Sequence, residues 1–206
     1  MKIRKAELND LPVMMEIYIS ARAFMAEHGN PDQWGAAGYP QEEVLLNDIR
    51  CGQSYVCVGE DGHVIGTFCF LIEQNGLPSD RDFTEGSWLD SSPYGIIHRL
   101  ASDGSWKGTG TFCLEWAQEQ CPHMRVYTHT ANTPMRSLLI RQGFTQCGIL
   151  HVQRDPFPRA AYEKFPGPEI SKLMNRIYKV HQLFRITSAQ AQKKQPVTAA
   201  FLLWCG

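Results

Sequence analysis

The sequence predicts a mixed α/β fold, with a mostly antiparallel central sheet flanked by helices and a helical C-terminal extension. Short apolar segments with strand character alternate along the chain with amphipathic segments of helical period. Some of the strand-like segments are joined by hairpin signals, whereas others are separated by a helix. The sheet should therefore contain both antiparallel neighbours and helical crossovers.

The first half of the chain begins with a short strand and a long helix. Asn9 or Asp10 can cap this helix, and Leu11, Met14 and Tyr18 follow at helical spacing. Residues 75–93 are polar and rich in turn formers, which indicates a long loop. Before that loop we expect, in order, a strand at 2–7, a helix at 11–28, a helix at 40–49, and strands at 54–58 and 64–72.

The second half alternates strands and helices before it closes with two strands. Gly143 stands where a helix C-cap favours glycine. The elements expected here are a strand at 94–101, a helix at 107–121, a strand at 125–130, a helix at 135–142, and strands at 144–152 and 159–164.

A proline-glycine-proline linker at 166–168 divides a domain at 1–165 from a basic extension at 166–206. The formal net charge of the chain is −1, but residues 169–206 carry +5. Apolar residues between Ile170 and Phe184 share one helical face. Such a helix can bind a membrane, nucleic acid or an acidic protein. Packing on the acidic body or on a second subunit is the favoured interpretation, because an apolar stripe is usually core.

The composition predicts a cytoplasmic location. Its seven cysteines include no paired spacing, which fits reduced thiols. No apolar run approaches the roughly 18 residues of a membrane span, and the charged start lacks a signal-peptide core. Without a CxxC or HExxH pattern, no metal site is expected.

The glycine-rich turn at 102–111 follows a strand and opens a helix. Free N–H groups and the helix dipole make such a turn an anion site, and Gly108 and Gly110 allow close approach of a phosphate. An ordinary tight turn is the alternative. The Walker order is absent because Lys107 precedes Gly108, and the Rossmann pattern fails because Cys113 stands where its third glycine is needed.

The turn resembles the signature of the GNAT superfamily of N-acetyltransferases. Their Gln/Arg-x-x-Gly-x-Gly/Ala pattern is matched by Ser105-Trp-Lys-Gly108-Thr-Gly110, with serine in the leading position. Asn132 after the next strand, and Gly143-Phe144 after the next helix, are similar to the asparagine loop and terminal Gly-Phe of that family. The resemblance covers about residues 2–165. The runs at 29–34 and 98–104 resemble a bacterial branch of GNAT proteins.

The resemblance implies acetyl-CoA as co-substrate. Main chain at His98, Arg99 and Leu100 would pair with the pantetheine arm, and the Leu100 N–H would polarise the thioester carbonyl. Asn132 would touch the pantetheine, with a helix cap as its structural alternative. The backbone N–H groups that would bind the pyrophosphate belong to Ser105, Trp106, Lys107, Gly108, Thr109 and Gly110.

The residues that would transfer protons match the family pattern less well than the cofactor-binding residues do. Leu139 occupies the position where many family members carry a tyrosine that protonates the thiolate. Tyr94 stands where several members carry the general base, and strand alternation puts it on the same face as His98. An unperturbed tyrosine has a pKa of about 10 and a histidine of about 6.5, so His98 titrates in the useful range. His129 is a third candidate, and for each the alternative is a structural side chain.

The acceptor should enter beside the loop that follows the first helix. Trp34 and Tyr39 are the candidate substrate-binding residues there, because an aromatic face beside a carboxylate such as Asp32 suits a cationic amine. A structural loop with Trp34 over the core is the alternative.

The sequence thus predicts direct acetyl transfer from acetyl-CoA to a primary amine of a small molecule or peptide. A catalytically weak acyl-CoA-binding regulatory module is the rival interpretation, because Leu139 and Ser105 depart from the family pattern. A nucleic-acid partner is a weaker interpretation, because it rests only on the basic tail and the net charge of the whole chain indicates no particular partner. The resemblance also implies a homodimer.

Overall fold

The computed structural model describes residues 1–35, 38–73, 83–152 and 155–166, and Met1–Lys164 form one compact unit. The predicted basic helix at 170–185 and the apolar run at 199–205 lie outside the described residues. The predicted domain boundary at 165/166 therefore stays a prediction.

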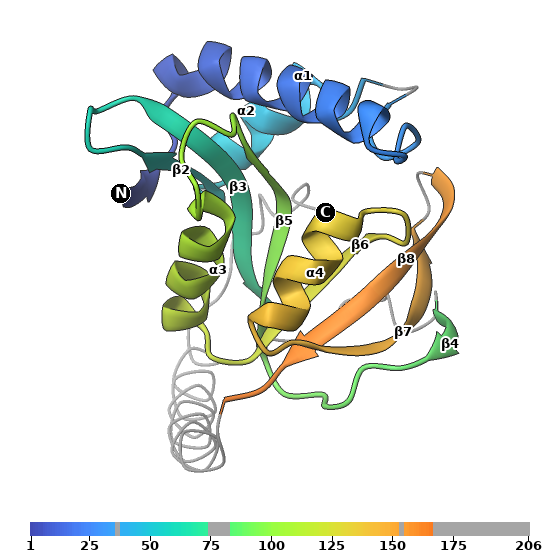
Figure 1. The fold of residues 1–206 in the computed structure, drawn as a ribbon. Coiled ribbons are helices and arrows are strands. Elements are labelled where there is room, and N and C mark those ends of the chain that lie inside the picture. Colours follow the sequence, from blue (N-terminus) through green and yellow to red (C-terminus); the bar gives the residue numbers. More distant parts are fainter. Residues whose placement is uncertain (36–37, 74–82, 153–154, 167–206) are drawn as a thin grey trace, which may run out of the picture. The chain divides into compact units, whose positions relative to one another are not determined.

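The unit is built on an eight-stranded sheet with the order β1-β2-β3-β5-β6-β8-β7-β4 (Figure 1). Among the strand pairs of the described residues, β5 and β6 run parallel and the others antiparallel. The predicted mixed, mostly antiparallel sheet is confirmed. Its strands are β1 (Lys2–Lys5), β2 (Ser54–Val58), β3 (Val64–Glu73), β4 (Phe83–Gly86), β5 (Tyr94–Ser102), β6 (Met124–His129), β7 (Thr145–Val152) and β8 (Asp155–Lys164).

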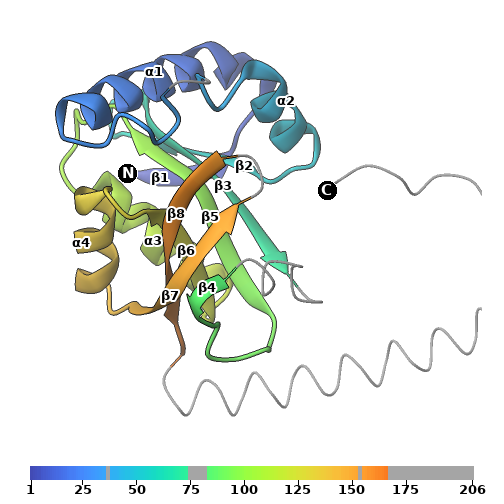
Figure 2. The same ribbon diagram turned by 90° about the vertical axis from the view of Figure 1, so that its right-hand side faces the viewer.

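Helices cover both faces of this sheet (Figures 1 and 2). They are α1 (Leu11–Glu27), α2 (Glu42–Arg50), α3 (Thr109–Gln120) and α4 (Thr133–Arg141), with a short 3-10 turn, η1 (Leu8–Asp10), before α1.

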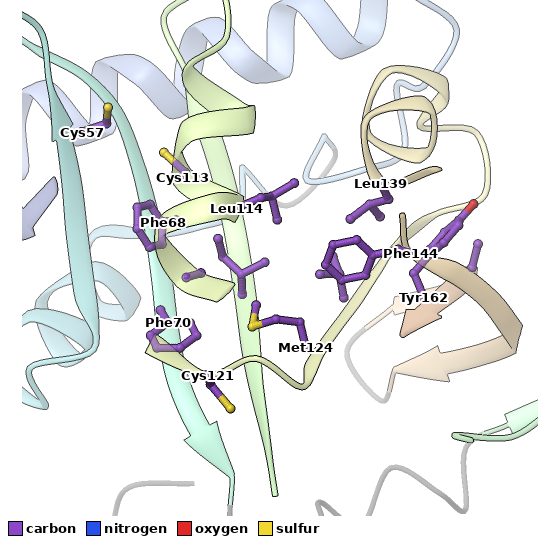
Figure 3. Packing of buried hydrophobic residues seen from close by; sticks show 14 of the residues in the cluster. Cys57, Phe68, Phe70, Cys113, Leu114, Cys121, Met124, Leu139, Phe144 and Tyr162 are labelled. Carbon is purple, nitrogen blue, oxygen red and sulfur yellow. The ribbon is translucent and has the colours of Figure 1, made fainter. Parts of the chain in front are cut away.

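Strand β2 shows how alternation divides the core into two layers. The side chain of Cys57 packs into the cluster formed with α3 and α4, part of which Figure 3 shows. Val56 and Val58 point the other way, into the cluster formed with α1 and α2. Because successive side chains of a strand face opposite sides, one apolar strand serves both layers.

Strand β4 lies inside the segment 75–93 that the sequence predicts as a loop, so this part of the prediction is wrong. Phe83 pairs with Leu150 and Gly86 with Gly148, at the edge of the sheet far from β3. These four residues are mostly exposed and show no alternation of apolar and polar side chains, so the sequence does not predict a strand here. Pairing with β7 gives them their strand conformation.

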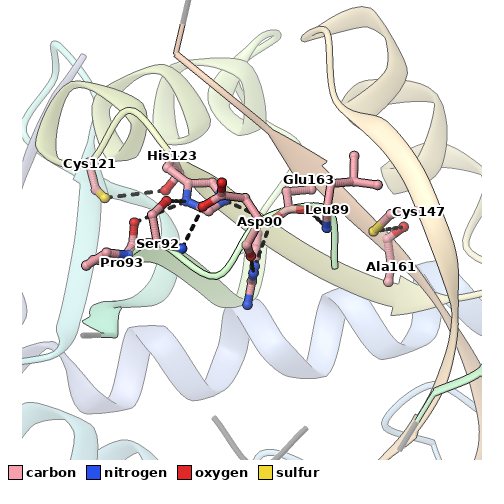
Figure 4. A network of polar contacts seen from close by, with 10 residues as sticks. Leu89, Asp90, Ser92, Pro93, Cys121, His123, Cys147, Ala161 and Glu163 are labelled. Carbon is pink, nitrogen blue, oxygen red and sulfur yellow. Dashed lines mark hydrogen bonds and ion pairs between the residues drawn. The ribbon is translucent and has the colours of Figure 1, made fainter. Parts of the chain in front are cut away.

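The chain returns from β4 to β5 over a buried polar network (Figure 4). Glu163 of β8 accepts hydrogen bonds from His123 Nε2 and Arg125 Nε, both at 2.8 Å, and from the Leu89 backbone N–H at 2.6 Å. Burial acts to raise the pKa of Glu163, but these hydrogen bonds outweigh it and hold the pKa below its usual range. A buried carboxylate therefore anchors the returning segment.

Candidate functional site

A cavity of about 990 Å³ opens where β5 and β6 part. Their parallel ladder comprises the pairs Gly95–Met124 and Ile96–Arg125, at the start of both strands. Farther along, both strands line the cavity, together with α1, α2, α4 and the loop between α1 and α2. Eight of the predicted site residues line this one cavity: Trp34, Tyr39, His98, Arg99, Leu100, Gly108, Gly110 and Asn132.

The N-terminus of α3 supplies one end of the cavity. Gly108 is its N-cap, with φ of +92°, and no side chain caps the helix. The first intrahelical bond runs from the Phe112 N–H to the Gly108 carbonyl at 2.9 Å. The N–H groups of Thr109, Gly110 and Thr111 precede that bond, so they form the donor set that the first turn of a helix offers to an anion.

The glycine turn contributes fewer residues than the sequence predicts. The Ser105 N–H donates to Asp103 Oδ1 at 2.9 Å, so an intramolecular carboxylate already occupies it. Trp106 packs against the core. Ser105, Trp106, Lys107 and Thr109 are not among the lining residues, whereas Asp103, Gly104 and Thr111, which the sequence did not single out, are. The donor set is thus shifted toward the helix.

A β-bulge in β5 forms the middle of the cavity. Thr67 of β3 pairs with Ala101 and Cys69 with His98, so one residue of β3 stands opposite two residues of β5, Arg99 and Leu100. Arg99 has φ of +55°, which L-residues rarely adopt. The extra residue interrupts the regular alternation of the strand at the point where it lines the cavity.

A buried ion pair holds the side chain of Arg99. Its guanidinium pairs with Asp48 of α2 and donates to Tyr39 Oη at 2.9 Å. Burial acts to lower the pKa of Arg99, but the acidic groups around it, the Asp48 carboxylate among them, hold it above its ordinary value. Burial raises the pKa of the Cys69 thiol to about 12, so the thiol stays neutral beside this pair. The side chain of the bulge residue therefore carries a fixed positive charge.

The loop between α1 and α2 is tied to the other half of the cavity through Gln33. Its Oε1 accepts from Asn30 Nδ2 and from Asn132 Nδ2, both at 3.0 Å. Asn132 also donates to Thr128 at 3.1 Å and caps α4 by accepting from the Met135 N–H at 3.1 Å. Asn132 thus has the helix-cap role given above as its alternative, and its contact with a pantetheine stays a prediction.

The two predicted acceptor residues lie at this end of the cavity. Trp34 is half-buried and meets the ring of Tyr18 edge-on, with 5.7 Å between ring centroids. Tyr39 is half-buried and accepts from Arg99. Both side chains therefore have structural contacts as well as a place in the cavity wall.

The structure separates the two predicted catalytic residues. His98 is half-buried in the cavity wall, and its ring centroid lies 5.4 Å from that of Tyr127. Tyr94 is 2% exposed and is not among the lining residues; its ring lies 3.9 Å from the Arg125 guanidinium carbon and packs by His123. Four residue steps of extended strand, about 13 Å in all, separate the two residues. Tyr94 supports the buried network, and only His98 reaches the cavity.

The cavity face of α4 differs from the predicted one. Leu139, which the sequence places at the position of the family's tyrosine, is fully buried in the core. The residues of α4 that line the cavity are Pro134, Met135, Leu138 and Arg141. None of these four can protonate a thiolate as a tyrosine would. The third candidate, His129, is 5% exposed, packs on Phe157, and does not line the cavity.

Several residues at the site were not predicted from the sequence. Tyr18, whose Oη donates to the Arg99 carbonyl, reads as an ordinary apolar position of α1. Asp48 looks like an ordinary acidic residue of an amphipathic helix. Arg159 looks like an ordinary charged residue of a strand, but in the structure this residue is only 6% exposed. A charged residue at a buried face is the signal that could have marked Asp48 and Arg159.

Within the parts of the chain that the structure describes, no group of three or more His, Cys, Asp and Glu could hold a metal ion. No helix of the described segments is long and apolar enough to cross a membrane.

Solved structures similar to this chain include acetyltransferases of the GNAT family. No family model matches the chain, and no curated protein sequence does. A GNAT-family acetyltransferase from Streptococcus agalactiae matches with a TM-score of 0.70 and 29% identity, over 80% of this chain and 95% of that chain. A GNAT-family acetyltransferase from Bacillus cereus matches with a TM-score of 0.53 and 16% identity, over 80% and 97%.

A plant enzyme of the same fold has been solved with its ligand. NAA60 from Arabidopsis thaliana, in complex with acetyl-CoA, matches with a TM-score of 0.55 and 16% identity, over 80% of this chain and 97% of that chain. The parting of β5 and β6, the bulge and the open end of α3 thus stand in a fold shared with acetyltransferases. On this fold and on the 29% identity to the streptococcal protein, the chain belongs to the GNAT superfamily of acyltransferases.

Proposed function

We propose that this chain transfers an acetyl group from acetyl-CoA directly to a primary amine of a small molecule or peptide. One observation carries the proposal: a single cavity joins the open N–H groups of α3 to the bulge in β5 and to the α1–α2 loop. The order of these parts matches a long ligand with an anionic middle and a reactive end, beside space for a second substrate.

The residues present fit acetyl-CoA. The N–H groups of Gly110 and Thr111, two residues that line the cavity, suit its pyrophosphate. A Cβ on Gly110 would stand 3.0 Å from Leu138 Cδ2, so side chains beyond glycine would narrow the passage between α3 and α4. Ile97, Val126, Met135 and Leu138 offer apolar walls for the pantetheine. The thioester supplies the activated acetyl group; the protein supplies position and charge.

The chain's own residues have two tasks at the reacting end. The backbone N–H of Leu100 donates toward the oxygen on which negative charge develops. His98, in the wall nearby, accepts the proton that the amine loses, directly or through water. The cavity face of α4 offers no tyrosine, so the thiolate leaves without a proton from this helix.

Two measurements test this function. Calorimetry with acetyl-CoA should give saturable binding at micromolar to millimolar concentration, and an amine panel should release free thiol. His98→Gln should bind acetyl-CoA with an unchanged Kd but lose at least tenfold in kcat, as expected for a lost general base. His151→Gln, on β7 outside the lining residues, is the matched control. No acetyl-CoA binding at millimolar concentration sinks the proposal.

A second function is favoured by the apolar cavity face of α4. A protein that binds acyl-CoA without turnover needs no proton donor there, so a regulatory acyl-CoA-binding module fits Pro134, Met135 and Leu138 equally well. Binding of acetyl-CoA without thiol release from any amine would select this alternative. Three further points stay predictions. Cell fractionation tests the cytoplasmic location, and sedimentation tests the homodimer. Nucleic-acid retention, measured with and without residues 166–206, tests the expected absence of a nucleic-acid partner.

A further inference from the structure

The carbonyl of the bulge residue is held from outside the sheet. Tyr18 of α1 is 1% exposed, and its Oη donates a hydrogen bond of 2.9 Å to the backbone oxygen of Arg99. The sequence separation is 81 residues, so this contact exists only in the folded protein. Burial raises the pKa of Tyr18 above its ordinary value, so the phenol remains a donor at every pH at which the protein would be assayed.

This carbonyl belongs to the same peptide unit as the Leu100 N–H. In a planar trans peptide the C=O and N–H point in opposite directions. Fixing the Arg99 oxygen therefore also fixes the direction of the Leu100 N–H. A carbonyl that accepts a hydrogen bond also polarises its peptide unit and strengthens the N–H as a donor.

Strand alternation shows which way that N–H points. Before the bulge, the Gly95 N–H donates to His123, on the β6 side; after it, the Asp103 N–H donates to Ile65, on the β3 side. From Gly95, every second N–H points to the β6 side, and this series reaches Arg99. From Asp103, the N–H groups of Asp103 and Ala101 point to the β3 side, so that of Leu100 points to the β6 side, where the cavity lies. One extra residue thus presents two successive amides to the cavity.

The bulge needs such support because it is costly by itself. A non-glycine residue with positive φ is strained by roughly 1–2 kcal/mol. Asp48 and Tyr39 hold the guanidinium of Arg99, and neither contact reaches the backbone of the bulge. Tyr18 provides the contact to the peptide itself.

We propose that Tyr18 is a positioning residue, which locks the Arg99–Leu100 peptide so that the Leu100 N–H stays aimed at the acetyl carbonyl. The role rests on the proposed acetyl transfer. Tyr18 is not among the residues that line the cavity, so it acts through the peptide and not on the substrate.

The test replaces the phenol by phenyl in Tyr18→Phe. Tyr162→Phe is the control, because Tyr162 is equally buried and its hydroxyl is also hydrogen-bonded, to Arg136 and Gln146, outside the cavity. Arg-Leu occurs once in the sequence, at 99–100. Labelling the arginine carbonyls with 13C and the leucine amides with 15N therefore gives one carbonyl-selected amide resonance, which reports this peptide in the full-length protein without any ligand.

We expect that resonance to move in Tyr18→Phe and to stay in place in Tyr162→Phe. With acetyl-CoA and the best amine, Tyr18→Phe should lose about tenfold in kcat, a part of the 100- to 1,000-fold that removal of an oxyanion donor costs. Its KM for acetyl-CoA should stay within about twofold, because the α3 amides are untouched. The infrared carbonyl band of bound acetyl-CoA should shift toward its frequency in water.

The outcomes separate the two proposals. A wild-type protein that transfers acetyl groups, with a Tyr18→Phe variant of unchanged resonance or unchanged kcat, overturns the positioning role and leaves the function intact. An equal loss of kcat in both variants also overturns it, because the effect is then general loosening. A wild-type protein without transfer overturns the proposed function and the positioning role with it, even if the resonance moves.

Discussion

Glu163→Gln should lower the stability of the protein strongly, although it replaces only one side-chain oxygen by an NH₂ group. The carboxylate is fully buried and receives three donors: His123 and Arg125 on Oε1, and Leu89 on Oε2. A carboxamide can accept at one end only. At the other end its NH₂ group faces an N–H donor, and the Arg125 guanidinium loses its counter-charge in either orientation.

The size of the loss follows from these contacts. Breaking a buried ion pair by removing one partner costs about 3–5 kcal/mol. For a chain of this size each kcal/mol lowers Tm by roughly 2–4 °C, so a fall of about 10 °C is expected. Urea denaturation and a thermal scan measure both quantities. Glu119→Gln, at an exposed position of α3, should change stability by less than about 0.5 kcal/mol.

The pH dependence supplies a second check. The pKa of Glu163 in the folded state lies below that in the unfolded chain, so its stabilisation is complete above the unfolded value near 4.3. It is lost as the pH falls through the folded pKa. The gap between wild type and Glu163→Gln should therefore be full at pH 7 and shrink below about pH 4.3. A loss under about 1 kcal/mol at pH 7, or a gap that is the same at pH 3, would refute the reasoning.

Three further predictions concern the cavity. Gly108→Ala and Gly62→Ala both place a Cβ in open space at positive φ, so each should lower the free energy of unfolding by about 1 kcal/mol. Only Gly108→Ala should weaken acetyl-CoA binding in calorimetry, and equal Kd values for the two variants would contradict the α3 site. Gln33→Leu leaves two buried amide donors without their acceptor, so it should lower the free energy of unfolding by about 1–3 kcal/mol. It should also speed hydrogen exchange of the α1–α2 loop, and an unchanged exchange rate would show that the contact with Asn132 does not hold this loop. Leu139→Tyr should overpack the core and cost about 1–3 kcal/mol, whereas Leu138→Tyr, on the cavity face, should cost less; the reverse order would contradict the assigned faces.

The expected order of helices and strands agrees closely with the structure. Strand β2 at Ser54–Val58 has the predicted bounds, and the helix predicted at 107–121 is α3, Thr109–Gln120. These elements have local causes: an apolar period, a capping residue or a turn-forming glycine. Strand β4 was missed because its cause lies in its partner β7, more than 50 residues later in the chain.

The candidate site divides in the same way. The glycine turn, Asn132 and the loop around Trp34 are visible as local motifs, and the structure brings them to one cavity. Tyr94 and His98 look equivalent in the sequence because both share the period of one strand. They differ in the fold, because β5 is paired with β6 at Tyr94's end and has parted from it at His98.

The sequence by itself determined the order of the elements other than β4, and the glycine turn at the head of α3, because periods and glycine chemistry are local properties of the chain. Only the tertiary structure decided where the amides of β5 point, which face of α4 meets the cavity, and that Tyr18 reaches the Arg99 carbonyl. Those features depend on a one-residue bulge and on contacts between distant segments. Such contacts leave no period in the sequence, and packing alone settles them.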